Sequence, residues 1–325
     1  MKRVKIVVAI LAVAFVGVIG WQVVKPPHEP IYQGKRLSEW PEPVYQDKPL
    51  SEELIGEANV DAAMRVLGTN AIPTLLRMLR VRDTTVGTVV ILHRRALYKN
   101  WGASLGFKKL GAAAEIAVPA VIGIAQEDIS PSSRYFAIMS LGYIGPSARK
   151  AVPSLLGWAT NADKQARKSA ITSLGGIHAE PERAVPVLTN ATYDPDPAIR
   201  VAAVWALGQF APEDRTVVPT LAALYKRAGA DTDMRLTAID VLGQLVDEPD
   251  QVVPVLTDAL HDPTNLVQIR AALGLGNFGP AAKTAVPALV KSLKGAGPNV
   301  GEWAAKALKA IDPEAAAKAG IPNSP

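Results

Sequence analysis

The strongest constraint on the fold is a Val-Pro pair that returns along the chain at an almost fixed interval. Successive copies are separated by 34, 33, 33, 35 and 33 residues. They lie at Val118-Pro119, Val152-Pro153, Val185-Pro186, Val218-Pro219, Val253-Pro254 and Val286-Pro287. A fixed period of this size is the signature of a stacked repeat array, in which each unit contacts only its neighbours. A chain of 325 residues can fold as one such array with a continuous core.

A second register begins in every unit at an alanine that never varies. Leucine follows four residues later, and a larger apolar residue follows seven residues later. The alanines are Ala137, Ala170, Ala203, Ala238, Ala271 and Ala304. These spacings place three apolar side chains on one face of a helix. The glycine after the leucine, at five positions from Gly142 to Gly276, is interpreted as the end of this helix.

Each unit is therefore predicted to be a pair of helices, entered near Val-Pro and joined by a polar turn. Short side chains in the turn can cap the second helix. The turns include Asp128 to Pro131, Asp194 to Pro197, Asp231 to Asp233 and Asp262-Pro263. One pair cannot bury its own apolar stripe, so neighbouring pairs must stack. The expected fold is all-α, a right-handed α-α superhelical solenoid of about six to seven helix pairs.

The order Val-Pro, turn with Asp, Arg, Ala and Leu-Gly resembles the HEAT repeat. The short period resembles the HEAT-like repeats of phycobilin lyases. The matching arginines precede the invariant alanine by three residues, at Arg134, Arg167, Arg200 and Arg235, whereas Gln268 and Gly301 replace them in the last two units. The resemblance covers about residues 60–311 and implies a scaffold whose second helices line a concave binding surface. The lyases imply an alternative, a lyase-like or regulatory enzyme subunit.

The two ends of the array carry atypical sequences, as expected of a solenoid. Ile72-Pro73 and Ala103 fit a weaker first unit that contains an insertion. Residues 60–68 resemble half a unit and are predicted to form an N-terminal cap. Residues 313–319, PEAAAKA, are predicted to form the C-terminal lid.

Residues 6–24 contain no charge and could span roughly 28 Å as a helix, close to the thickness of a bilayer. Cations lie before this stretch, and Lys25 alone follows it directly. We therefore expect residues 1–25 to be an N-terminal transmembrane anchor with the body outside the cytoplasm. A cleaved signal segment, which would make the protein secreted, and a buried helix are the alternatives.

The next segment contains nearly the same sequence twice, PIYQGKRLSEW from residue 30 and PVYQDKPLSEE from residue 43. Its many prolines favour an extended linker over residues 26–53, before a solenoid at 54–325. We interpret the second copy as the start of a helix at Ser51. The first copy is interpreted as a spacer that lengthens the linker. A peptide ligand for another protein is the alternative.

The composition offers little for catalysis. The chain has no cysteine, which excludes disulfides, thiolate metal sites and a cysteine nucleophile. The four histidines are scattered, and the Asp-x-Asp pairs at 194–196 and 231–233 lack the rest of a calcium loop. No phosphate-binding loop or nucleophile elbow is present. We therefore assign no catalytic residue, cofactor or metal site.

Two groups of residues are candidates for binding a partner. Helical offsets place aromatic and methionine side chains on the outward face of second helices, where they could anchor a protein or peptide: Tyr135, Phe136, Met139, Trp205 and Trp303. Packing between neighbouring units is the alternative. The insertion is basic and aromatic, a mixture suited to an anionic surface: Arg94, Arg95, Lys99, Trp101, Lys108 and Lys109. A solvated loop is the alternative.

The overall charge argues against a nucleic-acid partner. Of the formal net charge of +5, Lys2, Arg3 and Lys5 contribute +3, so the rest of the chain is nearly neutral. The sequence as a whole predicts a membrane-tethered, non-catalytic protein-binding scaffold. Besides the enzyme subunit named above, a structural spacer without a stable partner is the remaining alternative.

Overall fold

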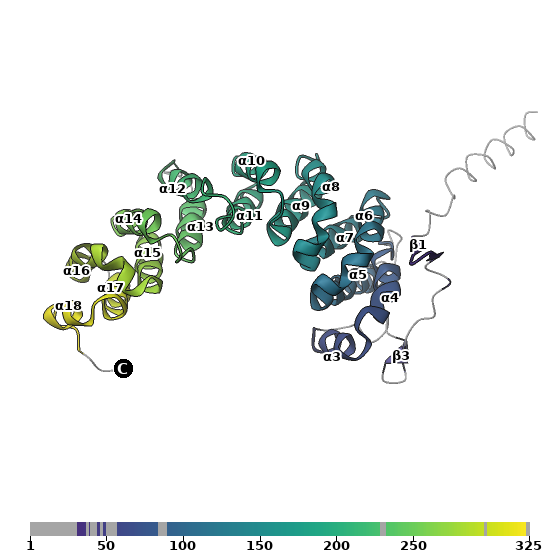
Figure 1. Cartoon of the computed structure of the whole chain (residues 1–325), viewed down its shortest axis with the longest axis horizontal. Helices are drawn as coiled ribbons and strands as arrows, with labels where there is room; N and C mark the ends of the chain where they lie inside the picture. Colours follow the sequence, from purple (N-terminus) through teal and green to yellow (C-terminus); the bar gives the residue numbers. More distant parts are fainter. Residues whose placement is uncertain are drawn as a thin grey trace, which may run out of the picture.

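The protein, seen in a computed structural model, is an arch of stacked helix pairs (Figure 1). The structure describes residues 31–36, 39, 44–45, 48–49, 57–83, 90–227, 232–295 and 298–322. These residues form seven helix pairs with one further helix at each end. The sequence-based prediction of an all-α solenoid is thereby confirmed.

The first helices of the pairs lie along the outer side of the arch, and the second helices lie along its inner, concave side (Figure 1). The first helices are α4 (Ile72–Leu79), α6 (Val118–Gln126), α8 (Val152–Trp158), α10 (Pro181–Ala191), α12 (Val217–Arg227), α14 (Pro249–Ala259) and α16 (Val286–Gly295). The second helices are α5 (Val90–Leu110), α7 (Pro131–Ile144), α9 (Lys164–Ile177), α11 (Pro197–Gly208), α13 (Thr232–Leu242), α15 (Asn265–Asn277) and α17 (Pro298–Ile311).

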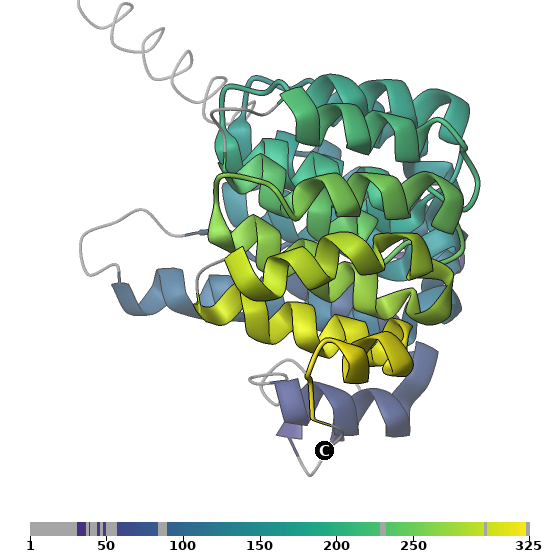
Figure 2. The same ribbon diagram turned by 90° about the vertical axis from the view of Figure 1, so that its left-hand side faces the viewer.

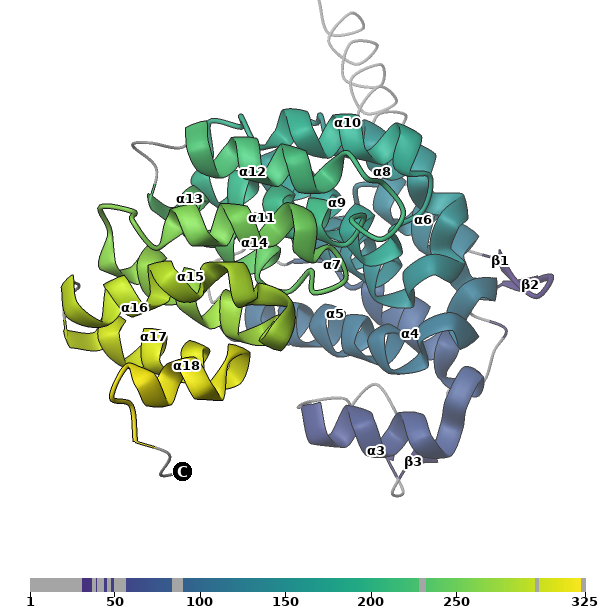
Figure 3. The same ribbon diagram turned by 60° about the vertical axis from the view of Figure 1, so that its left-hand side comes forward.

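Two further helices close the ends of the stack. Helix α3 (Glu57–Leu67) packs on α5 and buries Val60 and Ala63 completely. At the other end, α18 (Pro313–Lys318) packs on α17 and buries Ala316. Figures 2 and 3 show the helices layered between these two ends. The end helices cover apolar surface that has no further unit to pack against.

The glycine after the recurring leucine is a contact between units. It lies inside the helix in α7, α9 and α15, which corrects its interpretation there as the helix end, whereas Gly208 ends α11 and Gly243 directly follows α13. A Cβ added to Gly142 would lie 2.7 Å from the Cα of Ser173, and one added to Gly175 would lie 2.7 Å from the Cα of Ala206. Only a residue without a side chain allows the next second helix to come so close. These small residues form a seam along the inner side of the arch.

Two second helices, α7 and α15, end next to a different glycine, which lies three residues after the packing glycine. Gly145 follows α7 with φ of 78°, and Gly279 follows α15 and Phe278 with φ of 51°. Glycine adopts this left-handed conformation without strain. Each of these glycines starts a short 3₁₀ segment that leads to the next Val-Pro: η4 (Gly145–Ala151) and η5 (Gly279–Ala285), with η2 (Gly68–Ala71) and η3 (Gly111–Ala117) in the same role earlier in the chain.

The arginines that precede the invariant alanine tie the turns of adjacent units together. Arg167 in α9 contacts Asp194 in the next turn at 3.0 Å, and Arg235 in α13 contacts Asp262 at 3.3 Å. Asn100 occupies the equivalent position in α5, where it donates to the carbonyl of Val81 at 3.2 Å. Asp194 and Asp262 are therefore interunit ligands, and each also accepts a hydrogen bond from a backbone N–H inside its own turn, at Asp196 and Thr264.

Gln268 keeps only part of this arrangement. Its amide donates to the backbone carbonyl of Asp262, six residues earlier, at 2.6 Å. Arg167 makes the same local contact to the carbonyl of Asn161 at 2.9 Å. The shorter glutamine side chain thus holds its own turn, as the arginines do.

Both copies of the duplicated segment form short β-hairpins. Strand β1 (Ile31–Tyr32) pairs antiparallel with β2 (Lys35–Arg36), and β3 (Val44–Tyr45) pairs with β4 (Lys48–Pro49). Tyr32 is 5% exposed and belongs to the buried apolar core. The first copy therefore docks on the solenoid, which corrects its interpretation as a spacer that only lengthens the linker. The expected helix start at Ser51 lies outside the described residues, and α3 begins at Glu57.

The expected membrane-anchored localisation is wrong. Within the part of the chain that the structure describes, every helix is too short or too polar to cross a bilayer. Residues 6–24, on which the expectation rested, lie outside that part. The division at residues 25 and 53 stays a prediction.

Candidate partner-binding groove

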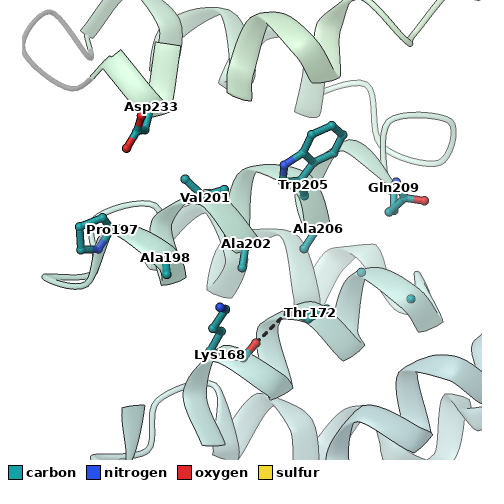
Figure 4. Close-up of a pocket in the computed structure, with 12 residues that line it drawn as sticks. Lys168, Thr172, Pro197, Ala198, Val201, Ala202, Trp205, Ala206, Gln209 and Asp233 are labelled. Carbon is teal, nitrogen blue, oxygen red and sulfur yellow. Dashed lines mark hydrogen bonds between the residues drawn. The ribbon is translucent and has the colours of Figure 1, made fainter. Parts of the chain in front are cut away.

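A hollow on the concave side of the arch lies between α9, α11 and the start of α13. Its volume is about 730 Å³. Its floor is apolar, formed in α11 by Ala198, Val201 and Ala202. Figure 4 shows these side chains with Trp205 beside them. We call this hollow, together with the smaller one described below, the groove.

Opposite charges line the two sides of the larger hollow. Lys168 of α9 and Asp233 of α13 lie on opposite sides of Val201 (Figure 4). Within the described residues, neither side chain has an ion-pair partner. Both charges are therefore available to a bound molecule.

Trp205 of α11 separates this hollow from a second one of about 250 Å³. The second hollow lies between α11, α13 and α15 and includes Asp240 and Arg270, whose side chains are 3.6 Å apart. Burial raises the pKa of the Asp240 carboxyl, and Arg270 partly opposes that shift. Trp205 is 39% exposed, a high value for a tryptophan that stands among packed helices. Its ring thus forms a wall shared by both hollows.

The predicted candidates in α7 lie on the same layer of second helices. Tyr135, Phe136 and Met139 are each half-buried. The rings of Tyr135 and Phe136 meet edge to face with centroids 4.9 Å apart, and Phe136 packs against the core. Burial raises the pKa of the Tyr135 and Tyr143 hydroxyls. For Phe136, packing between neighbouring units therefore explains the side chain better than exposure to a partner does.

Trp303 of α17 lies at the far end of this layer. Its ring packs against the core, and the ammonium group of Lys306 lies 4.2 Å from the ring centroid. Neither described hollow includes Trp303. The structure thus separates Trp303 from Trp205, although the sequence proposed the same role for both.

The basic candidates in α5 do not form one patch of free cations. Lys109 is 2.8 Å from Asp61, and Trp101 packs partly buried against the core. Lys108 is exposed and lies 5.6 Å from the ring centroid of Tyr143. Lys99 is half-buried, and the side chains of Arg94 and Arg95 lie outside the described residues.

Sequence reasoning missed the charged walls of the groove. Lys168 lies one residue after the arginine of its unit, Asp240 lies five after it, and Gln209 lies nine after it. The offsets of one and five placed Tyr135 and Trp205 on the outward face. Applied to every residue type instead of to aromatic residues, these two offsets would have found Lys168 and Asp240, whereas Gln209 lies beyond the offsets that were counted.

A third hollow, of about 500 Å³, lies at the turn edge of the arch, between the turns after α8 and α10. Tyr193, which is 59% exposed, lines it, and the guanidinium of Arg227 stacks 3.8 Å from the Tyr193 ring centroid. Among the described residues, no group of three or more His, Asp or Glu side chains gathers at metal-binding distance.

Comparisons with known proteins agree with this architecture. A family model described as HEAT repeats matches residues 118–192, 185–266 and 253–319. No curated protein matches the chain. Importin beta is similar with a TM-score of 0.54 and 16% identity, over 81% of this chain and 39% of its own. An engineered protein matches at 19% identity with a TM-score of 0.42, over 84% of this chain and 87% of its own. A designed armadillo repeat protein matches at 17% identity with a TM-score of 0.39, over 59% of this chain and 100% of its own.

Proposed function

We propose, from the premise that the chain belongs to the HEAT-repeat family, that it is a non-catalytic scaffold whose concave groove binds a segment of another protein. Residues 54–325 would form the unit that carries this function. The observation that carries the proposal is Trp205, an exposed ring with a hollow on either side.

Trp205 has the properties of an anchor for a polypeptide. Large aromatic side chains next to well-formed hollows contribute much of the binding energy at protein interfaces. The helix that carries Trp205 is fixed on both sides, because α11 packs against α9 and α13. A ring held in this way loses little conformational freedom when a partner binds.

The other candidates extend this surface along the concave side. We propose Tyr135 and Met139 as secondary contacts, because they have partly exposed side chains on a neighbouring second helix. Phe136 and Trp303 would support the surface from below, since both pack against the core. No catalytic role is assigned to any of these residues.

Site-specific crosslinking tests the proposal. A photoreactive amino acid at Gln209, which lines the groove, should capture a discrete protein from cells that express the chain. The same group at Lys226, exposed on the outer helix α12, should not capture that protein. The captured protein is then identified, purified and titrated against the purified chain.

Two alanine variants make the test specific. Trp205→Ala should weaken binding of the identified partner by about tenfold or more, because a groove anchor is removed. Tyr193→Ala removes an exposed ring at the turn edge and should leave the affinity unchanged. Equal capture from Gln209 and Lys226, or full affinity in Trp205→Ala, would argue against the groove as the binding site.

A further inference from the structure

The inner layer of the arch has an uneven charge along its length. Four consecutive second helices, α5, α7, α9 and α11, contain lysines and arginines but no aspartate or glutamate. The next second helix, α13, carries Asp233 and Asp240. Acidic side chains therefore first appear on the second helices at the groove, in α13.

Most of the described cations in these four helices are already committed to contacts within the protein. Arg134 and Arg167 hold turn carboxylates, Lys164 pairs with Asp196, and Lys109 pairs with Asp61. Their charges serve the packing of the units and the caps, so they contribute less to binding.

Three lysines of these helices have no carboxylate partner among the described residues. Lys99 is half-buried in α5, Lys168 lines the larger hollow, and Lys108 lies over the Tyr143 ring. In the repeat register Tyr143 is equivalent to Gly176 and Gln209, which both line the larger hollow. Lys108 thus lies near the C-terminal ends of the second helices and Lys168 near the N-terminal end of α9, and both are on the α5 side of Trp205.

We propose, building on the proposed function, that the groove binds an acidic polypeptide segment in one defined orientation. An apolar side chain of the segment lies on the floor beside Trp205. Aspartate or glutamate residues extend from it towards Lys168 and Lys108, and a lysine or arginine faces Asp233. Complementary charges of this kind set specificity and orientation, because the reversed placement brings like charges together.

Other anions fit this surface less well. A nucleic acid carries a phosphate at every nucleotide, and its chain would pass Asp233 and Asp240 in the same groove. A bilayer is flat, whereas Trp205 and Lys168 line a hollow on the inside of an arch (Figures 1 and 4). The apolar floor is suited to a hydrophobic side chain.

A phage-displayed library of random peptides, selected on the purified full chain, tests the proposal without a known partner. Selected peptides should share an apolar residue with aspartate or glutamate on one side of it. One synthetic peptide of that consensus is then titrated against the chain and its variants by fluorescence anisotropy. A copy with lysine at each acidic position serves as the charge-reversed probe.

Two variants that change the net charge equally provide the comparison. Lys168→Glu should weaken binding of the acidic peptide by about tenfold or more, because like charges then meet in the groove. Lys226→Glu, on the outer helix α12, should change the affinity less than about twofold at moderate salt, since distant exposed charges are screened. The charge-reversed peptide should bind wild type weakly and bind Lys168→Glu better.

The outcomes separate this inference from the function on which it rests. Peptides that need Trp205 but show no acidic preference, or bind Lys168→Glu normally, overturn the charge inference and leave the scaffold function standing. Selected peptides that bind Trp205→Ala as well as wild type overturn both, as does the absence of any enriched peptide. Displacement of the acidic peptide by single-stranded polythymidine, or by phosphatidylserine vesicles, at comparable charge concentration also overturns the inference.

Discussion

The guanidinium of Arg167 in α9 donates two hydrogen bonds to the carboxylate of Asp194, which lies in the turn of the following unit. The Nε donates to one carboxylate oxygen at 3.0 Å, and Nη2 donates to the other at 3.3 Å. The same side chain donates from Nη1 to the carbonyls of Asn161 and Ala162 in its own turn, at 2.9 and 3.0 Å. One residue thus closes its turn and joins it to the next unit, and such interfaces carry much of the stability of a solenoid.

Arg167→Ala should lower the free energy of unfolding by about 2 kcal/mol, because Asp194 and two carbonyls lose a charged donor in a partly buried site. Denaturant titration followed by circular dichroism measures the change. Arg183→Ala is the control, since Arg183 pairs with Glu180 at an exposed position and its removal should cost less than about 1 kcal/mol. Equal losses in the two variants would mean that the interunit contact adds nothing.

Gly142→Ala should lower the free energy of unfolding by about 1–3 kcal/mol, because the added methyl group would lie within 3 Å of Ser173 in the next unit. Gly157→Ala is a matched control in α8, where an added Cβ meets nothing within 4 Å. That change should be neutral or should stabilise the protein by about 0.5–1 kcal/mol, since alanine favours helix. Similar results for the two variants would contradict the close-packed seam.

The helix pairs could be predicted from sequence because each rests on short-range spacing that recurs in unit after unit. Val118, Ala137 and Leu141 define one unit, and the same pattern returns in the others. Stacking of such units then follows from the apolar stripe that each exposes. Trp205 could be placed on the concave layer by counting residues from Arg200, since the count needs only the helical period.

The remaining features depend on contacts between distant residues. Sequence shows that Gly142 is small, but only its approach to Ser173 shows that the small size serves packing and not helix termination. The burial of Tyr32 likewise depends on a surface that forms only when the solenoid is assembled. Lys168 and Asp233 come from different units, so their opposition across Val201 emerges only in the fold.

The stability of the protein should fall above pH 10, in part because of Tyr225. Burial and the nearby carboxylates of Asp262 and Asp258 raise the pKa of this hydroxyl from 10.0 to about 12. Between these values the unfolded chain loses a proton that the folded chain keeps, so the free energy of unfolding decreases as the pH rises.

Tyr225→Phe isolates this contribution. The variant lacks the hydroxyl that donates to Asp262 at 3.4 Å, so it should be slightly less stable than wild type at pH 8. By pH 11.5 the wild type should have lost about 1 kcal/mol more than the variant, and the two stability curves should converge. Denaturant titrations from pH 8 to 11.5 provide the measurement. Parallel curves over that range would show that Tyr225 titrates alike in the folded and unfolded chain.

Trp205→Ala should change stability much less than an aromatic substitution in the core of the same unit. Trp205 is 39% exposed, whereas Phe210, five residues later, is fully buried. Phe210→Ala should lower the free energy of unfolding by about 3–5 kcal/mol, because it removes a ring from a closed core. Trp205→Ala should lower it by less than about 1 kcal/mol, since a surface ring gives up fewer contacts. Thermal and denaturant unfolding of the two variants measure this contrast.

A loss of stability in Trp205→Ala as large as that in Phe210→Ala would make the Trp205 ring a structural element of the stack. A small loss together with weakened binding would mean that Trp205 is retained for the partner, because the solenoid folds without it.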